Sequence, residues 1–150
     1  MKKYLIIRFS SIGDIVLTTP VVRCLKEQTG AEVHYLSKQQ FRGLLEPNPH
    51  IDKCHFIKED VAEVMDELKA QNFDEVIDLH NNLRSLKVKR ALGVKSTSFE
   101  KHNLEKWLLV NAKINLLPDV HIVDRYMQTV AHFGVKNDGA GLDYFLTPAD

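Results

Sequence analysis

The sequence predicts an α/β fold in which helices cover both faces of a mostly parallel β-sheet. Short apolar runs rich in β-branched residues alternate with segments of helical periodicity, which is typical of βαβ units. The clearest unit opens the chain, where the apolar run 4–9 stops at a small polar loop, residues 10–14, and an apolar helical pattern follows at once. A length of 150 residues is typical of a single domain.

The elements follow in a regular order. Five segments have strand character: residues 4–9, 32–36, 53–57, 75–79 and 94–99. Four helical patterns lie between them, at residues 15–29, 39–45, 61–71 and 83–92. Strands joined in this way pair in parallel through right-handed crossovers. After residue 100 the pattern predicts two successive helices, 104–114 and 120–133, and then a glycine-rich turn with a short last strand over 138–148.

Composition and charge exclude several classes of protein. Twenty Lys and Arg residues balance twenty Asp and Glu residues, so no overall field favours nucleic acid. Cys24 and Cys54 are isolated, and the histidines show no metal-ligand spacing, so we expect no metal site. We interpret His50 and His55 as surface residues. The start lacks the features of a signal peptide, and no apolar run could span a membrane, so we expect a cytoplasmic protein.

The loop at residues 10–14 is the first candidate site. Ser10, Ser11 and Gly13 have small side chains, so a ligand can approach the backbone, and the unpaired N–H groups of the next helix favour an anionic or hydroxyl-rich ligand. Asp14 would lie at the carboxyl end of a strand, where open α/β sheets bind ligands, and could accept a hydroxyl proton. The alternative is that Asp14 caps the helix and the serines form an ordinary turn.

A second candidate site follows the fourth predicted strand. Arg84 and Lys87 are three residues apart near a helix start and can face one anion together. For Lys87, as for Lys89 and Arg90, the alternative is a solvated helix face. His80 is either a second proton carrier or a hydrogen-bonding loop residue.

A third candidate site lies in the last predicted helix. His121 and Arg125 are four residues apart and share a helix face. Arg125 either adds a positive group to a binding cleft or pairs with an acidic neighbour to anchor the helix. His121 is either part of the same site or a cap at the helix start.

The first loop resembles the start of the heptosyltransferase-like glycosyltransferases, glycosyltransferase family nine. The resemblance rests on an apolar strand followed by Ser10-Ser11-Ile12-Gly13-Asp14 and then by Thr18 and Pro20, and it extends from residue 4 to about 146. It implies that Asp14 is the general base that deprotonates the acceptor hydroxyl. It also implies an acceptor-binding set made of Ser10, Ser11, Gly13, Arg84, Ser85, Lys87, His121 and Arg125.

The same resemblance implies a larger protein with two Rossmann-like domains, the GT-B arrangement. The first binds the acceptor and supplies the base, and the second binds a nucleotide-sugar donor without a metal. We therefore expect residues 1–150 to be the N-terminal acceptor-binding domain, inactive by itself. The expected reaction is transfer of a sugar, with heptose from ADP-heptose foremost, to a cell-envelope glycan or glycolipid such as the lipopolysaccharide core. Peripheral contact with the inner membrane is open.

One segment departs from the family pattern. Several basic residues often follow the third strand in enzymes that act on acidic inner-core sugars, whereas this chain has Lys58-Glu59-Asp60. The departure favours a less acidic acceptor.

Two functions of other classes remain. One is a receiver-like domain, although the first strand lacks the adjacent acidic pair that receivers need. The other is a carbohydrate-binding module without activity.

Overall fold

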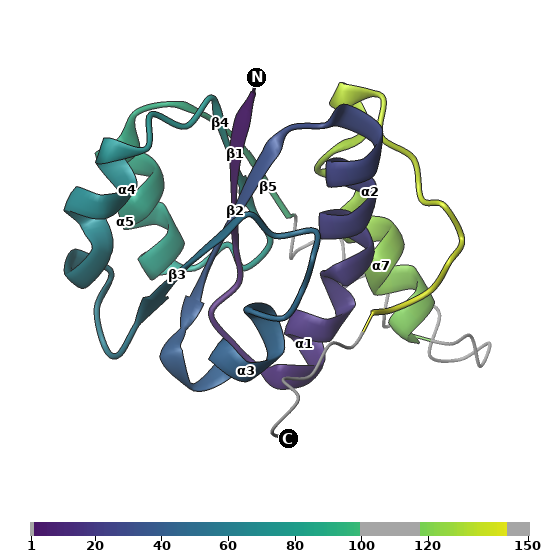
Figure 1. The fold of residues 1–150 in the computed structure, drawn as a ribbon, viewed down its shortest axis with the longest axis horizontal. Coiled ribbons are helices and arrows are strands. Elements are labelled where there is room, and N and C mark those ends of the chain that lie inside the picture. Colours follow the sequence, from purple (N-terminus) through teal and green to yellow (C-terminus); the bar gives the residue numbers. More distant parts are fainter. Residues whose placement is uncertain (1, 100–117, 144–150) are drawn as a thin grey trace.

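The computed structural model describes residues 2–99 and 118–143. Its centre is a five-stranded sheet in which every pair of neighbouring strands is parallel, in the order β3-β2-β1-β4-β5 (Figure 1). The strands are β1 (Lys3–Ile7), β2 (Glu32–Lys38), β3 (Lys53–Ile57), β4 (Glu75–Asp78) and β5 (Lys95–Ser98). The structure thus confirms the predicted fold class.

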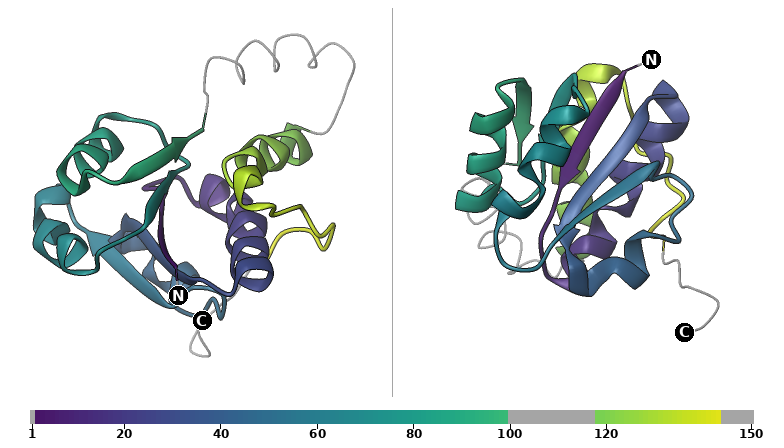
Figure 2. Two further views of the ribbon diagram at one scale, coloured as in Figure 1. Left: turned by 90° about the horizontal axis from the view of Figure 1, so that it is seen from above. Right: turned by 60° about the vertical axis from the view of Figure 1, so that its left-hand side comes forward.

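Helices cover both faces of the sheet, as Figure 2 shows from above. One face carries α1 (Ile12–Leu17), α2 (Thr19–Thr29) and α7 (Pro118–Gln128), and the other carries α4 (Met65–Ala70) and α5 (Leu83–Leu92). The short helix α3 (Arg42–Leu45) follows β2. Three 3₁₀ turns complete the described elements: η1 (Gln39–Phe41), η2 (Val61–Val64) and η4 (Ala131–Phe133).

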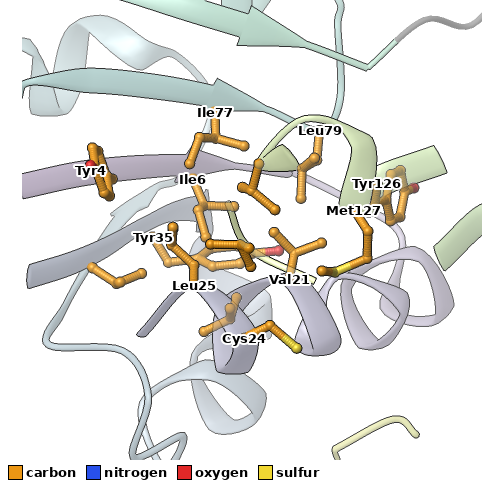
Figure 3. Packing of buried hydrophobic residues seen from close by; sticks show 14 of the residues in the cluster. Tyr4, Ile6, Val21, Cys24, Leu25, Tyr35, Ile77, Leu79, Tyr126 and Met127 are labelled. Atoms are coloured by element: carbon orange, nitrogen blue, oxygen red, sulfur yellow. The ribbon is translucent and has the colours of Figure 1, made fainter. Parts of the chain in front are cut away.

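Alternation along β1 divides the core between the two faces. Tyr4 and Ile6 pack into the cluster formed with α1, α2 and α7, part of which Figure 3 shows. Leu5 and Ile7 pack into the second cluster, with α4 and α5. Successive side chains of a strand point to opposite faces, so a strand buried on both sides is a continuous apolar run.

The helices differ in detail from the prediction. A single helix was expected over 15–29. Instead, α1 begins at Ile12, and Thr18 interrupts the helix before α2 begins. The Thr18 hydroxyl donates to the Ile15 carbonyl at 2.6 Å, and Pro20 occupies the first turn of α2, where its missing N–H is tolerated. The patterns at 39–45 and 61–71 each form a 3₁₀ turn followed by a short α-helix.

The last part of the chain is described only in part. Helix α7 starts at Pro118, two residues before the predicted start, while the predicted helix 104–114 lies outside the described residues. Residues 138–143 form neither a helix nor a strand, and the rest of the predicted final strand is outside the described part.

Residues 138–143 are fastened to α2 mainly by Arg23, and the Asp143 N–H also donates to the Thr19 hydroxyl at 2.8 Å. Arg23 donates two hydrogen bonds to Asp138, at 2.6 and 2.8 Å, one to Asp143 at 2.8 Å and one to the carbonyl of Gly141 at 2.9 Å. The hydrogen bonds that Arg23 donates to Asp138 are the largest of the causes that raise the pKa of Arg23 above its ordinary value. This clamp fixes a segment more than a hundred residues away in sequence against the first helical layer.

Two buried histidines correct one sequence-based interpretation. His55 was expected at the surface, but it is 1% exposed and His34 is 2% exposed. Nδ1 of His34 and Nε2 of His55 share a hydrogen bond at 2.9 Å. Glu32 bonds His34 on one side, at 2.6 Å, and Glu67 bonds His55 on the other. The four side chains link β2, β3 and α4. Among the described residues, no group of three or more His, Cys, Asp or Glu side chains could hold a metal ion.

The buried histidines predict a stability that depends on pH. Burial lowers the pKa of both imidazoles, and their hydrogen bonds to the carboxylates of Glu32 and Glu67 only partly offset this effect. The unfolded chain takes up protons near pH 6.5 while the folded chain resists them, so the free energy of unfolding is highest above that pH and falls as pH drops. Each proton taken up on unfolding accounts for at most about 1.4 kcal/mol per pH unit.

Urea unfolding between about pH 7.5 and 5.5 measures this effect, because the range brackets the ordinary histidine pKa. The imidazole carbon-bound proton signals of His34 and His55 in the folded protein should titrate below that value. A flat stability across this range, or ordinary titration of both rings, contradicts the prediction.

Candidate functional site

The candidate site lies at the carboxyl edge of the sheet, where β1 and β4 end side by side. The chain reverses its direction of winding between these strands, and such switch points are where open α/β sheets bind ligands. Hydrogen bonds join the two loops here. The Leu79 N–H donates to the Ile7 carbonyl at 3.0 Å, and the Phe9 N–H donates to Nδ1 of His80 at 3.1 Å.

Asp14 lies inside α1 and is not its N-cap residue. Ser11 has the extended backbone of an N-cap residue, and Asp14 is the third helical residue. Its Oδ2 accepts hydrogen bonds from the Ser11 N–H at 3.2 Å and from the Ser11 hydroxyl at 2.8 Å. The N-cap is therefore Ser11 rather than Asp14, and Asp14 takes part in the cap from the third helical position, as one half of a capping box. The positive end of the helix dipole favours a negative group, and in this six-residue helix Asp14 itself is that group.

The charge of Asp14 is stabilised by Arg8. Nη2 of Arg8 lies 3.1 Å from Oδ2, and the Asp14 side chain is 37% exposed. Partial burial opposes ionisation, but the Ser11 hydrogen bonds and the Arg8 charge outweigh it and lower the pKa of Asp14. All its described contacts use Oδ2, so Oδ1 has no hydrogen bond within residues 2–99 and 118–143. Asp14 is thus an ionised carboxylate with one oxygen available.

An open hollow of about 610 Å³ lies in front of this carboxylate. A Cβ on Gly13 would meet nothing within 4 Å, so the space at that position is free for a ligand. The hollow is lined by Ser11, Ile12, Gly13, Asp14, Val16, Leu17, Ile122 and Leu142. It therefore combines one polar loop with apolar walls from α1, α7 and the clamped segment 138–143.

Ser10 contributes its backbone. Its carbonyl accepts a hydrogen bond from Nε of Arg8 at 2.7 Å, and the peptide bond between Ser10 and Ser11 is cis. Its side chain is half-buried and does not line the hollow.

Ser85 has a structural role at the start of α5. Its hydroxyl accepts from the Asn82 N–H at 2.9 Å, and its own N–H donates to Oδ1 of Asn82 at 2.9 Å. Ser85 is 0% exposed. This correction to the expected acceptor-binding set follows from the reciprocal cap, which uses the hydroxyl inside the protein.

Arg84 and Lys87 lie on α5, across the sheet from α1. Arg84 is half-buried and Lys87 is exposed, and neither has an ion-pair partner in the part of the chain that is described. They do not line the hollow beside Asp14. Lys89, for which a solvated face was considered, turns inward and pairs with Asp78 at 2.9 Å.

The third candidate site is separate from the first. Arg125 lines a smaller hollow of about 190 Å³ with the end of β5, and its Nη1 lies 3.5 Å from Oε1 of Gln128. Among the described residues it has no acidic partner, so the anchoring ion pair is not seen there. The side chain of His121 lies outside the described residues. The contribution of α7 to the Asp14 hollow is Ile122.

Sequence reasoning missed two members of the site. Arg8 is a single cation between the buried Ile7 and Phe9, and a lone charge in an apolar run was a signal that could have identified it. Leu142 had no comparable signal, because tertiary contacts of its neighbours with Arg23 and Thr19 hold its segment beside the hollow.

Comparison with known proteins supports the resemblance. No protein-family model matches the chain. Lipopolysaccharide heptosyltransferase 1 from Campylobacter coli is 27% identical over 135 residues, which cover 83% of this chain and 40% of that protein. The chain thus spans less than half the length of this relative.

Solved structures share the fold. A glycosyl transferase family 9 protein from Veillonella parvula matches 99% of this chain and 46% of its own, with a TM-score of 0.76 and 20% identity. E. coli heptosyltransferase WaaC with ADP matches 94% of this chain and 50% of its own, with a TM-score of 0.68 and 17% identity. The chain is thus similar in sequence to part of a lipopolysaccharide heptosyltransferase, and it shares its fold with about half of a glycosyl transferase family 9 structure.

Proposed function

We propose that this chain is the N-terminal, acceptor-binding domain of a glycosyltransferase that moves heptose from ADP-heptose to a cell-envelope glycan such as the lipopolysaccharide core. The observation that carries the proposal is Asp14, an ionised carboxylate with its Oδ1 available at the rim of an open hollow. A second domain would bind the donor and close over the same edge of the sheet, as in a GT-B protein.

In the proposed reaction, Oδ1 of Asp14 accepts the proton of an acceptor hydroxyl. The acceptor oxygen forms a bond to the anomeric carbon of heptose as the bond from that carbon to the phosphate oxygen breaks, and ADP leaves. The proton is then on Asp14, whose lowered pKa favours its release to solvent. Within the described residues no group of three or more His, Cys, Asp or Glu side chains could hold a metal.

The donor is proposed from the relatives. WaaC of E. coli has been solved with ADP and with ADP-2-deoxy-2-fluoro heptose, and these are properties of that protein. In our proposal the equivalent nucleotide sugar binds the second domain, which leaves the hollow at Asp14 for the acceptor.

The hollow favours an acceptor with an uncharged reacting sugar. Its apolar walls fit the carbon-bound face of a sugar ring, and no cation is among the described residues that line it. Lys58-Glu59-Asp60 forms a turn whose three backbone N–H groups all donate to the carboxylate of Glu63, and none of the three residues lines the hollow. Acid groups of the acceptor would bind farther away, at Arg84 and Lys87.

We also propose a cytoplasmic location with peripheral contact at the inner membrane. Leu83 is 77% exposed and Leu86 is 36% exposed beside these two cations, and apolar and basic groups together favour an anionic lipid surface. None of the described helices is long and apolar enough to cross a membrane.

A transfer assay tests the proposed function. Full-length protein, ADP-heptose and a core oligosaccharide that lacks its outer heptose should give ADP and an acceptor heavier by one heptose, measured by mass spectrometry. UDP-glucose and GDP-mannose serve as donor controls. Absence of transfer from every nucleotide sugar tried contradicts the proposed activity. If titration also shows no binding of the acceptor, the alternative of a non-catalytic sugar-binding module is contradicted as well.

Replacing Arg84 with alanine should raise the acceptor KM about tenfold, the size of a lost charge-assisted contact, while the donor KM changes little. Steady-state kinetics with each substrate varied in turn measure the two constants. Arg90→Ala, an exposed cation six residues along the same helix, is the matched control. Equal increases in both constants would assign Arg84 to the scaffold.

A further inference from the structure

Arg8 follows β1 directly and is nearly enclosed. Its neighbours Ile7 and Phe9 are each 0% exposed, and its own side chain is 12% exposed. Removing a guanidinium from water is costly unless its N–H groups find partners. The contacts of its N–H groups therefore indicate the role of this buried charge.

Each nitrogen of Arg8 contacts a different group. Nε donates to the Ser10 carbonyl at 2.7 Å, and Nη1 donates to the Leu79 carbonyl at 3.0 Å. Nη2 lies 3.1 Å from Oδ2 of Asp14. One rigid, planar group thus joins the loop after β1, the residue after β4 and the candidate base.

These contacts treat the two oxygens of Asp14 differently. Oδ2 receives Arg8 together with the N–H and the hydroxyl of Ser11, while no contact of Oδ1 is found in the described residues. A carboxylate oxygen with three donors has little capacity left, so the orientation of the group is fixed and the proton must go to the other oxygen.

We infer that Arg8 is the positioning residue of this site: it anchors Oδ2 of Asp14 to the end of β4 so that Oδ1 faces the acceptor as the proton-accepting oxygen. The inference rests on the proposed function. The guanidinium also opposes retention of the proton on Asp14 after transfer, which returns the base to its ionised form.

A purely structural role is the competing explanation. Two carbonyl contacts alone would join the β1 and β4 loops, and their loss would lower stability without altering the titration of Asp14. Contact with Oδ2 adds an electrostatic effect that a structural clamp lacks, because removal of the positive charge raises the pKa of the carboxyl.

The test compares Arg8→Gln and Arg8→Lys in the full-length protein. Arg8→Gln should lower kcat about tenfold or more with little change in donor KM, and it should move the acid limb of the kcat/KM profile to higher pH. Arg8→Lys restores a cation and should recover part of kcat and return the acid limb toward that of the wild type. Arg42→Gln, which removes an exposed ion pair with Glu46, is the matched control.

An unchanged kcat and acid limb in Arg8→Gln overturns the inference, as does an Arg8→Lys variant no better than Arg8→Gln. Asp14→Asn separates this outcome from failure of the proposed function. If Asp14→Asn is inactive and Arg8→Gln is unaffected, only the role of Arg8 is lost. If Asp14→Asn turns over like the wild type, the proposed base and its positioning residue are lost together.

Circular dichroism checks that the variants fold. A nuclear magnetic resonance titration of the wild-type chain tests the inference without any variant. In the wild-type chain, the Nε–H signal of Arg8 should shift as the Asp14 carboxyl titrates, with the same midpoint below the ordinary value near 3.8. If the chemical shift of the Arg8 Nε–H does not change as Asp14 titrates, the inference is overturned even when no Arg8 variant folds.

Discussion

Asp14→Asn should lower the turnover of the full-length protein by at least about a hundredfold, the effect expected for loss of a general base. The amide has nearly the shape of the carboxylate, and its oxygen can still accept from Ser11. It cannot take a hydroxyl proton, and it no longer balances the charge of Arg8, which lies 3.1 Å away. Chemistry should therefore be lost while the local fold is retained.

Single-turnover kinetics at saturating donor and acceptor measure the effect on chemistry directly. Asp66→Asn, the same change on the exposed first turn of α4 on the other face of the sheet, is the matched control. In the wild type, the acid limb attributed to Asp14 should lie below its ordinary pKa, because Ser11 and Arg8 outweigh the effect of burial. A variant that keeps more than about a tenth of wild-type turnover would remove Asp14 from the mechanism.

Lys89→Met should lower the free energy of unfolding by about 3–5 kcal/mol, the cost of leaving a buried charge without its partner. That charge is Asp78, which is 0% exposed. Its Oδ1 accepts from the backbone N–H groups of His80 and Asn81, at 3.0 and 2.7 Å. Its Oδ2 has no described partner apart from Lys89, at 2.9 Å. Methionine keeps the length of the side chain and removes the cation together with its hydrogen bond to the Ser98 hydroxyl, at 2.8 Å.

Urea denaturation at neutral pH measures this loss. Lys87→Met, two residues earlier on the exposed side of the helix, should change stability by less than about 0.5 kcal/mol. In the double variant Lys89→Met with Asp78→Asn, part of the stability should return because the unpaired charge is gone. A loss below about 1 kcal/mol for Lys89→Met alone would mean that water reaches Asp78 and replaces the lysine.

The strands could be predicted because their signal is local. All five appear within two residues of their expected ends. The signal is strongest for β1, because a strand buried on both faces is apolar throughout. It is weaker for β5, which has the sequence Lys-Ser-Thr-Ser and is only partly buried. The break at Thr18 was missed because the apolar periodicity continues across it. It depends on the Thr18 hydroxyl, which also contacts Tyr35 on β2 at 2.8 Å, a tertiary contact that helical spacing does not reveal.

The candidate site was predictable where one loop forms it and was missed where distant segments meet. Ser11, Gly13 and Asp14 come together because they are neighbours in sequence. Arg84 and Arg125 were both assigned to binding by their charge, yet neither lines the hollow beside Asp14, and Arg125 lines another hollow at the end of β5. Ser85 was assigned to binding from its position in a motif, whereas only the structure shows its hydroxyl bonded within the α5 cap.

The Arg23 clamp sets a limit on how far this domain can be shortened. A chain cut ahead of residue 138 would deprive Arg23 of Asp138 and Asp143 and would delete Leu142 from the hollow beside Asp14. An arginine whose side chain is only 7% exposed would then lack a counter-ion. A minimal domain for crystallisation or ligand screening must therefore retain this C-terminal segment, although most of the sheet is complete by residue 98.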